Sequence, residues 1–148
     1  MNIQINETGK KIIFCGALLF LLGLLQGALI PYFLNPRMAL SAHLAAVQSG
    51  MALMIFGVIW EILVLKEKWL TVTYYTSIAS MYLVWFAITL SAVIGASKAL
   101  PMAGKGFSTT NTNEVVVELI VYIGAGCGVV SSVLIVIGLY AALNKSNT

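Results

Sequence analysis

The chain has 148 residues, of which 60% are hydrophobic and only 9% are charged, and its formal net charge is +3. Soluble domains carry about 25% charged residues, so this composition excludes an ordinary soluble domain and is typical of an integral membrane protein. The few charges are spread over several short polar stretches, which argues against nucleic-acid binding and makes them markers of membrane topology.

The first apolar run predicts a membrane helix over about residues 11–34, because it is uncharged and long enough to cross about 30 Å of hydrocarbon. It is too long for the hydrophobic region of a cleaved signal peptide, so we expect it to be retained. Gly16, Gly23 and Gly27 fall on one stripe of this helix, and small residues on a stripe let a second helix approach closely. Gln26 lies beside the stripe and is expected to find a partner inside the bundle.

The second span is predicted over about residues 38–65, and the short connection to the first makes the two an antiparallel hairpin. It contains His43, the only histidine of the chain, a few residues inside the apolar run. Ionisable side chains within membrane spans are rare and are functional candidates by default. The alternative is a neutral imidazole that only packs, donating a hydrogen bond to a carbonyl group of a neighbouring helix.

The third and fourth spans are predicted over about residues 69–96 and 115–143. The third is rich in hydroxyl and aromatic side chains, and four of them roughly share one stripe that we interpret as a cavity wall. These residues are Ser77, Tyr82, Trp85 and Thr89. The alternative is that the hydroxyls bond preceding carbonyls and the rings pack between helices. In the fourth span, Gly124 and Gly128 form a GxxxG pair, which is typical of close helix contact.

The longest connection, residues 97–114, is expected to be irregular, either a lid across one mouth of the bundle or a solvated linker. Four spans place both ends of the chain on one side of the membrane. The basic residues assigned to that side are Lys10, Lys11, Lys66, Lys68 and Lys145, against Arg37, Lys98 and Lys105 on the other. The positive-inside rule therefore predicts cytoplasmic termini, in what we expect to be a bacterial inner membrane, and it places His43 near the same outer end as this connection.

The sequence thus predicts an all-α fold, a single four-helix transmembrane domain over residues 1–148. It contains no hydrolytic triad, zinc motif, phosphate-binding loop or dinucleotide fingerprint. A lone intramembrane histidine suits the single axial ligand of a haem, which needs one imidazole, a flat apolar slot and anchors for its propionates. Gly50 and the alanines after His43 would provide the slot, and Arg37 would meet a propionate. The haem would be non-covalent, since no CxxCH motif occurs, and Cys15 and Cys127 are expected to be packing residues.

Three stretches carry a family resemblance: FLLGLLQGALIPYFLNPRMALSAHL at Phe20–Leu44, FGVIW at Phe56–Trp60 and PMAG at Pro101–Gly104. They resemble the hydroxylaminobenzene mutases, small membrane enzymes similar to the styrene oxide isomerases. The resemblance implies haem b between the subunits of a homotrimer, with His43 as the axial ligand of a ferric iron that acts as a Lewis acid.

The implied reaction is a rearrangement without net redox change, in which a small N-hydroxyarylamine becomes an aminophenol. In the epoxide isomerase alternative, an aryl epoxide becomes an aldehyde. We expect Ser49, Tyr82 and Trp85 to shape the aromatic pocket. Ser49 stands where the family usually has asparagine, and a hydroxyl cannot match the reach of an amide.

Two other classes of protein remain open from the sequence. A non-enzymatic membrane scaffold or transport component would use His43 only for packing and would be colourless. A haem electron carrier or sensor is disfavoured, because electron carriers usually saturate the iron with two protein ligands.

Overall fold

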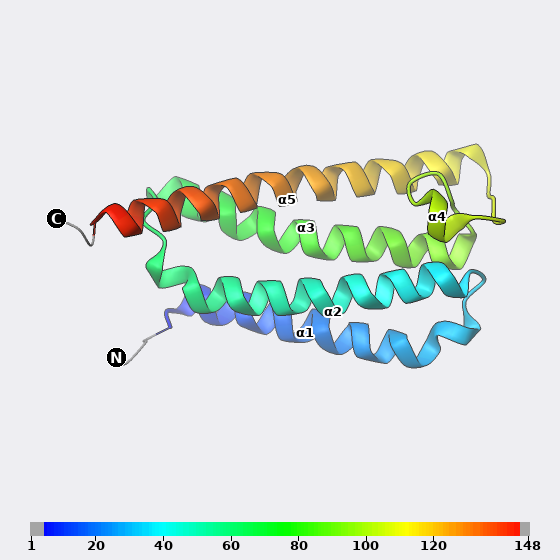
Figure 1. The fold of residues 1–148 in the computed structure, drawn as a ribbon, viewed down its shortest axis with the longest axis horizontal. Helices are drawn as coiled ribbons and strands as arrows, with labels where there is room; N and C mark the ends of the chain where they lie inside the picture. Colours follow the sequence, from blue (N-terminus) through cyan, green and yellow to red (C-terminus); the bar gives the residue numbers. More distant parts are fainter. Residues whose placement is uncertain (1–4, 146–148) are drawn as a thin grey trace.

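The computed structural model, drawn in Figure 1, describes residues 5–145, which form four long helices, one short helix and two 3-10 turns. In chain order these are α1 Glu7–Leu29, η1 Ile30–Tyr32, α2 Pro36–Ile59, η2 Trp60–Ile62, α3 Glu67–Ile94, α4 Pro101–Gly104 and α5 Asn111–Lys145. No strand occurs among the described residues. The four long helices are long and apolar enough to cross a membrane, which confirms the predicted all-α, four-span bundle.

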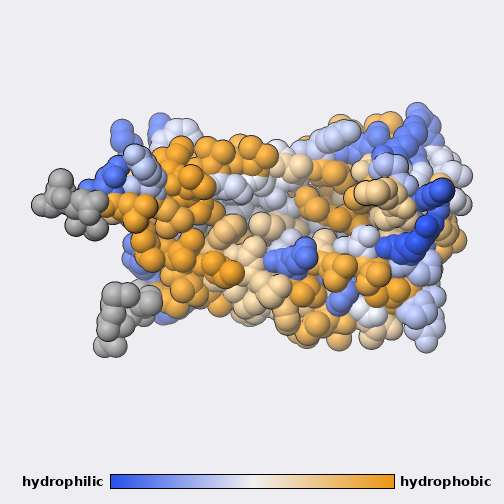
Figure 2. Space-filling view, in the orientation of Figure 1, coloured by the Kyte–Doolittle hydropathy of each residue, from blue (hydrophilic) through white to orange (hydrophobic). Residues whose placement is uncertain are grey.

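The helices are arranged as two antiparallel hairpins. In Figure 1, α1 and α2 form one layer and α3 and α5 the other, and the hairpins meet mainly where α2 contacts α3. Both ends of the chain lie at one end of the bundle, and α4 lies at the other. Figure 2 shows a hydrophobic band between hydrophilic ends, the surface expected of a membrane-spanning bundle.

Glycines set the close contact between α1 and α2. A Cβ atom at Gly16 would lie 2.6 Å from the Gly50 carbonyl oxygen, and one at Gly57 would lie 2.6 Å from the Gly9 carbonyl oxygen. A Cβ at Gly23 would lie 2.8 Å from the Cβ of Ala46. The glycine stripe predicted on the first span therefore packs against α2, with the two backbones in contact.

Glycines also allow close contact between α3 and α5 in the second hairpin. A Cβ atom at Gly124 would lie 2.9 Å from Cγ2 of Val84, and one at Gly128 would lie 2.7 Å from Oγ of Ser80. The predicted GxxxG pair thus marks the contact between α5 and α3. The side of α5 that faces away from α3 is largely exposed. In the most apolar 18-residue stretch of α5 only 17% is buried, against 28–33% in the corresponding stretches of the other three long helices.

The helix ends differ from the predicted spans for local reasons. α1 ends at Leu29, because the chain tightens into η1, which contains Pro31. α2 ends at Ile59, because η2 follows and leads into extended backbone at Leu63. The polar run that we expected to be irregular up to residue 114 is helical from Asn111. Thr110 precedes that helix, and its hydroxyl accepts a hydrogen bond from a first-turn N–H at 3.4 Å, so the expectation of an irregular segment was wrong there.

Candidate functional site

His43 lies in the first half of α2, against α1. Its Nδ1 is 2.7 Å from the carbonyl oxygen of Gly23, and since a carbonyl only accepts, Nδ1–H is the donor. A Cβ atom at Gly27 would lie 2.8 Å from Nδ1 and 2.9 Å from Cε1 of the imidazole, so only glycine fits beside the ring. The ring is therefore held by the backbone of α1, in the tautomer that leaves the Nε2 lone pair free.

The carbonyl contact is the alternative that the sequence left open, and it is compatible with metal ligation. Histidines that bind metals almost always donate their other ring N–H to a carboxylate or a backbone carbonyl, which fixes tautomer and orientation. Within residues 5–145, Nε2 of His43 makes no hydrogen bond, and the side chain is partly exposed. Leu40 and Leu44, which flank it on α2, are 46% and 47% exposed. The free nitrogen therefore belongs to the apolar outer side of the α1–α2 hairpin.

A chain of hydrogen bonds joins α1 to α3 and so bridges the two layers of the bundle. The indole Nε1–H of Trp85 donates to Oε1 of Gln26 at 2.7 Å, and Nε2 of Gln26 donates to Oγ1 of Thr89 at 3.0 Å. The Thr89 hydroxyl donates in turn to the Trp85 carbonyl at 2.9 Å. Gln26 is 5% exposed, so the partner predicted for its amide is present and the buried polar group is satisfied.

Tyr82 provides a second link between these helices. Its hydroxyl donates to the carbonyl of Cys15 at 2.8 Å, and its ring meets that of Trp85 edge to face, with centroids 6.4 Å apart. The Tyr82 hydroxyl and the Trp85 indole N–H therefore both donate hydrogen bonds to groups of α1. Their exposed ring surfaces, rather than their polar atoms, are what remains available to line a pocket.

The structure does not gather the predicted site residues around His43 within one chain. Ser49 lies six residues after His43, which puts the two about 120° apart around the helix. It is one turn beyond Ala45, which packs against the cluster formed by α2 and α3, and its hydroxyl makes no hydrogen bond within residues 5–145. Gly50 faces Gly16 of α1 at backbone contact, so α1 fills the space where a slot was expected.

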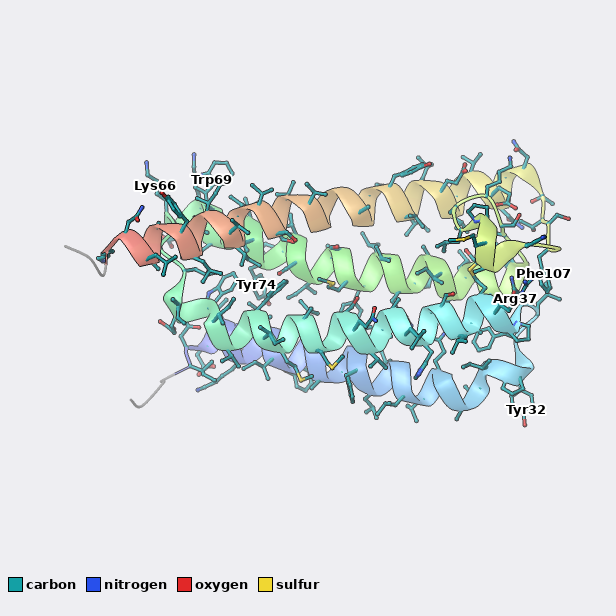
Figure 3. The ribbon with its side chains drawn as sticks, viewed as in Figure 1. Tyr32, Arg37, Lys66, Trp69, Tyr74 and Phe107 are labelled. Carbon is teal, nitrogen blue, oxygen red and sulfur yellow. The ribbon has the colours of Figure 1, made fainter. Side chains whose placement is uncertain are left out.

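The Asn-Pro-Arg motif at the start of α2 holds the connection that contains α4. Asn35 is fully buried; its Oδ1 accepts the N–H of Met38 at 3.1 Å as the helix cap, and its Nδ2 donates to the carbonyl of Ala103 at 3.0 Å. The guanidinium of Arg37 donates to the carbonyl of Lys105. Figure 3 shows Arg37 beside Phe107 at this end of the bundle. Arg37 is exposed and has further N–H donors free to bind a carboxylate.

Glu114, in the first turn of α5, closes the same connection from the other side. Its carboxylate accepts the backbone N–H of Ser97 at 3.0 and 3.1 Å and that of Lys98 at 3.0 Å, and the residue is only 3% exposed. Neither Asn35 nor Glu114 was predicted from the sequence as a residue of the site. An asparagine directly before a proline and a glutamate in a first helical turn are the signals that mark such residues.

An apolar cavity of about 550 Å³ lies at this end as well, lined by Leu29, Tyr32, Phe33, Leu34 and Val93. His43 does not line it. Among the described residues, no three His, Cys, Asp or Glu side chains cluster as metal ligands.

Fold and site together define a small four-helix integral membrane protein with one intramembrane imidazole, held by backbone and open at Nε2. Residues 8–140 match the family model described as styrene oxide isomerase, and the chain belongs to that family. It is 36% identical over 108 residues to hydroxylaminobenzene mutase HabA of Ectopseudomonas oleovorans, covering 72% of this chain and 80% of that protein. It is 35% identical over 106 residues to hydroxylaminobenzene mutase HabB of the same organism, covering 71% and 65%. No solved structure matches the chain.

These comparisons confirm the predicted family and the prediction of an isomerase. The family model and both mutases are named for intramolecular rearrangements, so the chain is an enzyme of that kind rather than a scaffold or a transport component.

Proposed function

We propose that this chain is a haem b-dependent isomerase of the hydroxylaminobenzene mutase type. It converts a small N-hydroxyarylamine into an aminophenol by moving the oxygen from nitrogen to the ortho carbon of the ring. The observation that carries the proposal is His43, whose Nδ1–H is bonded to Gly23 at 2.7 Å and whose Nε2 is free. The identity to two hydroxylaminobenzene mutases, at 36% and 35%, selects the substrate class.

The residues fit a non-covalent haem with one axial protein ligand. Nε2 of His43 would bind the iron. Arg37 lies about 9 Å from His43 along the axis of α2 and about 120° around it, so its long side chain would have to reach around the helix to pair with a propionate. Bound ferric haem supplies a Lewis acid that stabilises charge on one substrate oxygen without net redox change. The Gly23 carbonyl accepts a hydrogen bond from Nδ1–H, so in the neutral imidazole the Nε2 lone pair is the one available to a metal. Ser49, Tyr82 and Trp85, which were predicted to shape the aromatic pocket, lie in the packing between the helices, so they would hold α1, α2 and α3 in place rather than line the outer surface where Nε2 lies.

The proposal includes a homotrimer with the haem near the subunit interface. The free nitrogen of His43 lies on the outer side of the α1–α2 hairpin, whereas Ser49, Tyr82 and Trp85 belong to the packing between α1, α2 and α3. Within one chain, Nε2 of His43 is therefore not enclosed by a pocket. A second copy packed against this surface would enclose the haem. We place the protein in a bacterial inner membrane with cytoplasmic termini, on the distribution of basic residues.

The second candidate is an aryl epoxide isomerase that yields an aldehyde. The observation that favours it is the match of residues 8–140 to the styrene oxide isomerase family model. Both reactions need charge stabilisation at one oxygen, so the two candidates differ in substrate and not in the role of His43.

The test begins with the visible absorption spectrum of the protein purified in detergent, recorded before and after dithionite. We expect a Soret band that shifts on reduction, is lost in His43→Ala and returns in His43→Gly when imidazole is added. Lys10→Gln, at an exposed residue far from His43, is the control and keeps the band. Phenylhydroxylamine and styrene oxide are then compared as substrates by product chromatography, and aminophenol is the expected main product.

Two results would count against the proposal. A colourless wild-type protein, even when hemin is supplied during expression, would remove the haem mechanism. A wild-type Soret band and undiminished activity in His43→Ala would show that another group holds the haem.

A further inference from the structure

A second cavity lies at the opposite end of the bundle from α4, between the first turns of α1 and α3 and the turn η2. Its volume is about 410 Å³, within the range of small-molecule sites. The polar and aromatic residues that line it include Thr8, Lys11, Trp60, Glu67, Tyr74 and Tyr75. Figure 3 shows Tyr74 between the two layers, near the end that carries Lys66 and Trp69. Nothing in the proposed isomerase chemistry uses this cavity.

Trp60 is the buried group that points to a ligand here. The residue is 5% exposed, and its ring packs edge to face on Tyr74 with centroids 6.4 Å apart. Its indole N–H has no acceptor within residues 5–145, although buried indole N–H groups usually find one. No polar side-chain atom that is wholly buried among the described residues lacks a partner, so this N–H keeps an accessible surface. The cavity that Trp60 lines is the space available to it.

The cavity also holds two opposite charges that are not paired with each other. Within residues 5–145 the ammonium of Lys11 and the carboxylate of Glu67 form no hydrogen bond or ion pair. The hydroxyls of Tyr74 and Tyr75 are likewise without hydrogen-bond partners in that part of the chain. The polar groups that remain free to bind a ligand are therefore several hydrogen-bond donors, one of them cationic, and one anionic acceptor, the Glu67 carboxylate.

We propose that this cavity binds the headgroup of a phosphatidylethanolamine lipid. The Lys11 ammonium and the Trp60 N–H would bind the phosphate, and the Glu67 carboxylate would accept hydrogen bonds from the primary ammonium of the headgroup. An inorganic phosphate would leave Glu67 unpaired, and a phosphatidylglycerol headgroup has no cation for it. A choline headgroup has a cation but no N–H to donate.

The position in the membrane agrees with a lipid ligand. Tryptophan and tyrosine gather at the level of the lipid headgroups, where one side of the ring is apolar and the other is wet. The cavity lies near the ends of α1 and α3, with Trp60, Tyr74 and Tyr75 in its lining. Lipid acyl chains would continue along the apolar surface of the bundle below it.

The experiment is native mass spectrometry of the full chain released from detergent after incubation with equal amounts of dioleoyl phosphatidylethanolamine, phosphatidylglycerol and phosphatidylcholine. We expect the ethanolamine lipid to be retained in preference to both others. Lys11→Gln and Glu67→Gln should each lower its retention about tenfold, because each removes a hydrogen bond to a charged group. Trp60→Phe keeps an aromatic side chain but removes the N–H together with part of the indole, and because it removes a neutral donor it should lower retention by a smaller factor.

Two neighbouring charges provide matched controls. Lys10, which pairs with Glu7 at 2.8 Å, and Glu61 are exposed at the same end and do not line the cavity. Lys10→Gln and Glu61→Gln should retain the lipid as the wild type does. Equal losses in these controls, or equal retention of the three lipids in wild type and variants, would overturn the proposal.

Competition by soluble compounds tests whether the cavity recognises the whole headgroup or only its phosphate. We expect millimolar O-phosphoethanolamine to displace the lipid and inorganic phosphate to be much weaker. Equal competition by the two would show an anion site only and would refute the assignment of Glu67. If the wild-type protein shows no Soret band in the haem experiment, the lipid-binding result still stands, since none of these residues contacts His43.

Discussion

Gly27→Ala is the sharpest perturbation of the candidate site, because it adds one methyl group against the His43 ring. The new Cβ would lie 2.8 Å from Nδ1 and 2.9 Å from Cε1, closer than nonbonded atoms tolerate. The atoms it meets belong to a side chain that is partly exposed, so the imidazole can turn outward while α1 and α2 stay in place. The turn breaks the bond to the Gly23 carbonyl, and with it the fixed direction of Nε2.

The expected consequence is a large functional loss with little loss of stability. Losing the hydrogen-bond partner of a ligating histidine typically lowers metal affinity about 10- to 100-fold, and we expect haem content and isomerase rate to fall by a factor in that range. Glycine to alanine within a helix gains about 0.5–1 kcal/mol of intrinsic preference, which offsets part of the strain. The melting temperature should therefore change little.

The assay compares three variants by Soret absorbance per protein, aminophenol formation and thermal melting followed by circular dichroism. Gly126→Ala adds a Cβ that meets nothing within 4 Å and should behave as the wild type does. Gly16→Ala places its Cβ 2.6 Å from the Gly50 carbonyl oxygen, where backbone must move, and should lose about 1–3 kcal/mol of stability. Wild-type haem content and rate in Gly27→Ala would refute the reasoning, and so would a drop in melting temperature as large as that of Gly16→Ala.

Three further predictions concern side chains that hold the helices together or would bind the haem. Glu114→Gln should lose about 1–3 kcal/mol, because a neutral amide oxygen replaces a carboxylate that holds the backbone N–H groups of Ser97 and Lys98. Thermal melting measures the loss, and the control is Glu118→Gln, one turn further along α5, where the half-buried carboxylate makes no hydrogen bond within residues 5–145. Trp85→Phe should lose about 1–2 kcal/mol because Oε1 of Gln26 loses its donor, and denaturation in mixed micelles should detect this. Arg37→Ala should lower haem content several-fold and Arg37→Lys less so, measured by Soret absorbance; equal content in both would remove Arg37 as a propionate partner.

Much of the fold follows from composition and small-residue spacing. Four long apolar runs with few charges predict four helices, since any shorter element would leave backbone groups unsatisfied in lipid. The stripe of Gly16, Gly23 and Gly27 predicts the face that meets another helix. The helix ends were less predictable, because a 3-10 turn such as η2 depends on contacts that sequence periodicity does not record.

The site was predictable in its chemistry and less so in its geometry. A lone histidine in a membrane span marks His43, but the carbonyl that orients it depends on how far α1 is shifted along α2, and apolar sequences do not specify that. Ser49 was expected beside His43, yet helical geometry places the two on different sides of α2. Glu114 was missed because its partners are backbone N–H groups 16 and 17 residues earlier in the chain.

The orientation of His43 rests on a carbonyl and on an absent methyl group, so no side chain of α1 takes part. Most positions on α1 can therefore vary without moving the imidazole, provided that Gly23 and Gly27 stay opposite it. What must be kept is the register of α1 opposite α2, because one residue inserted or deleted within α1 after the glycines that contact α2 would shift the helix by about 1.5 Å and rotate it by about 100°. Insertions and deletions within α1, rather than substitutions along it, are the changes that this part of the enzyme cannot accommodate.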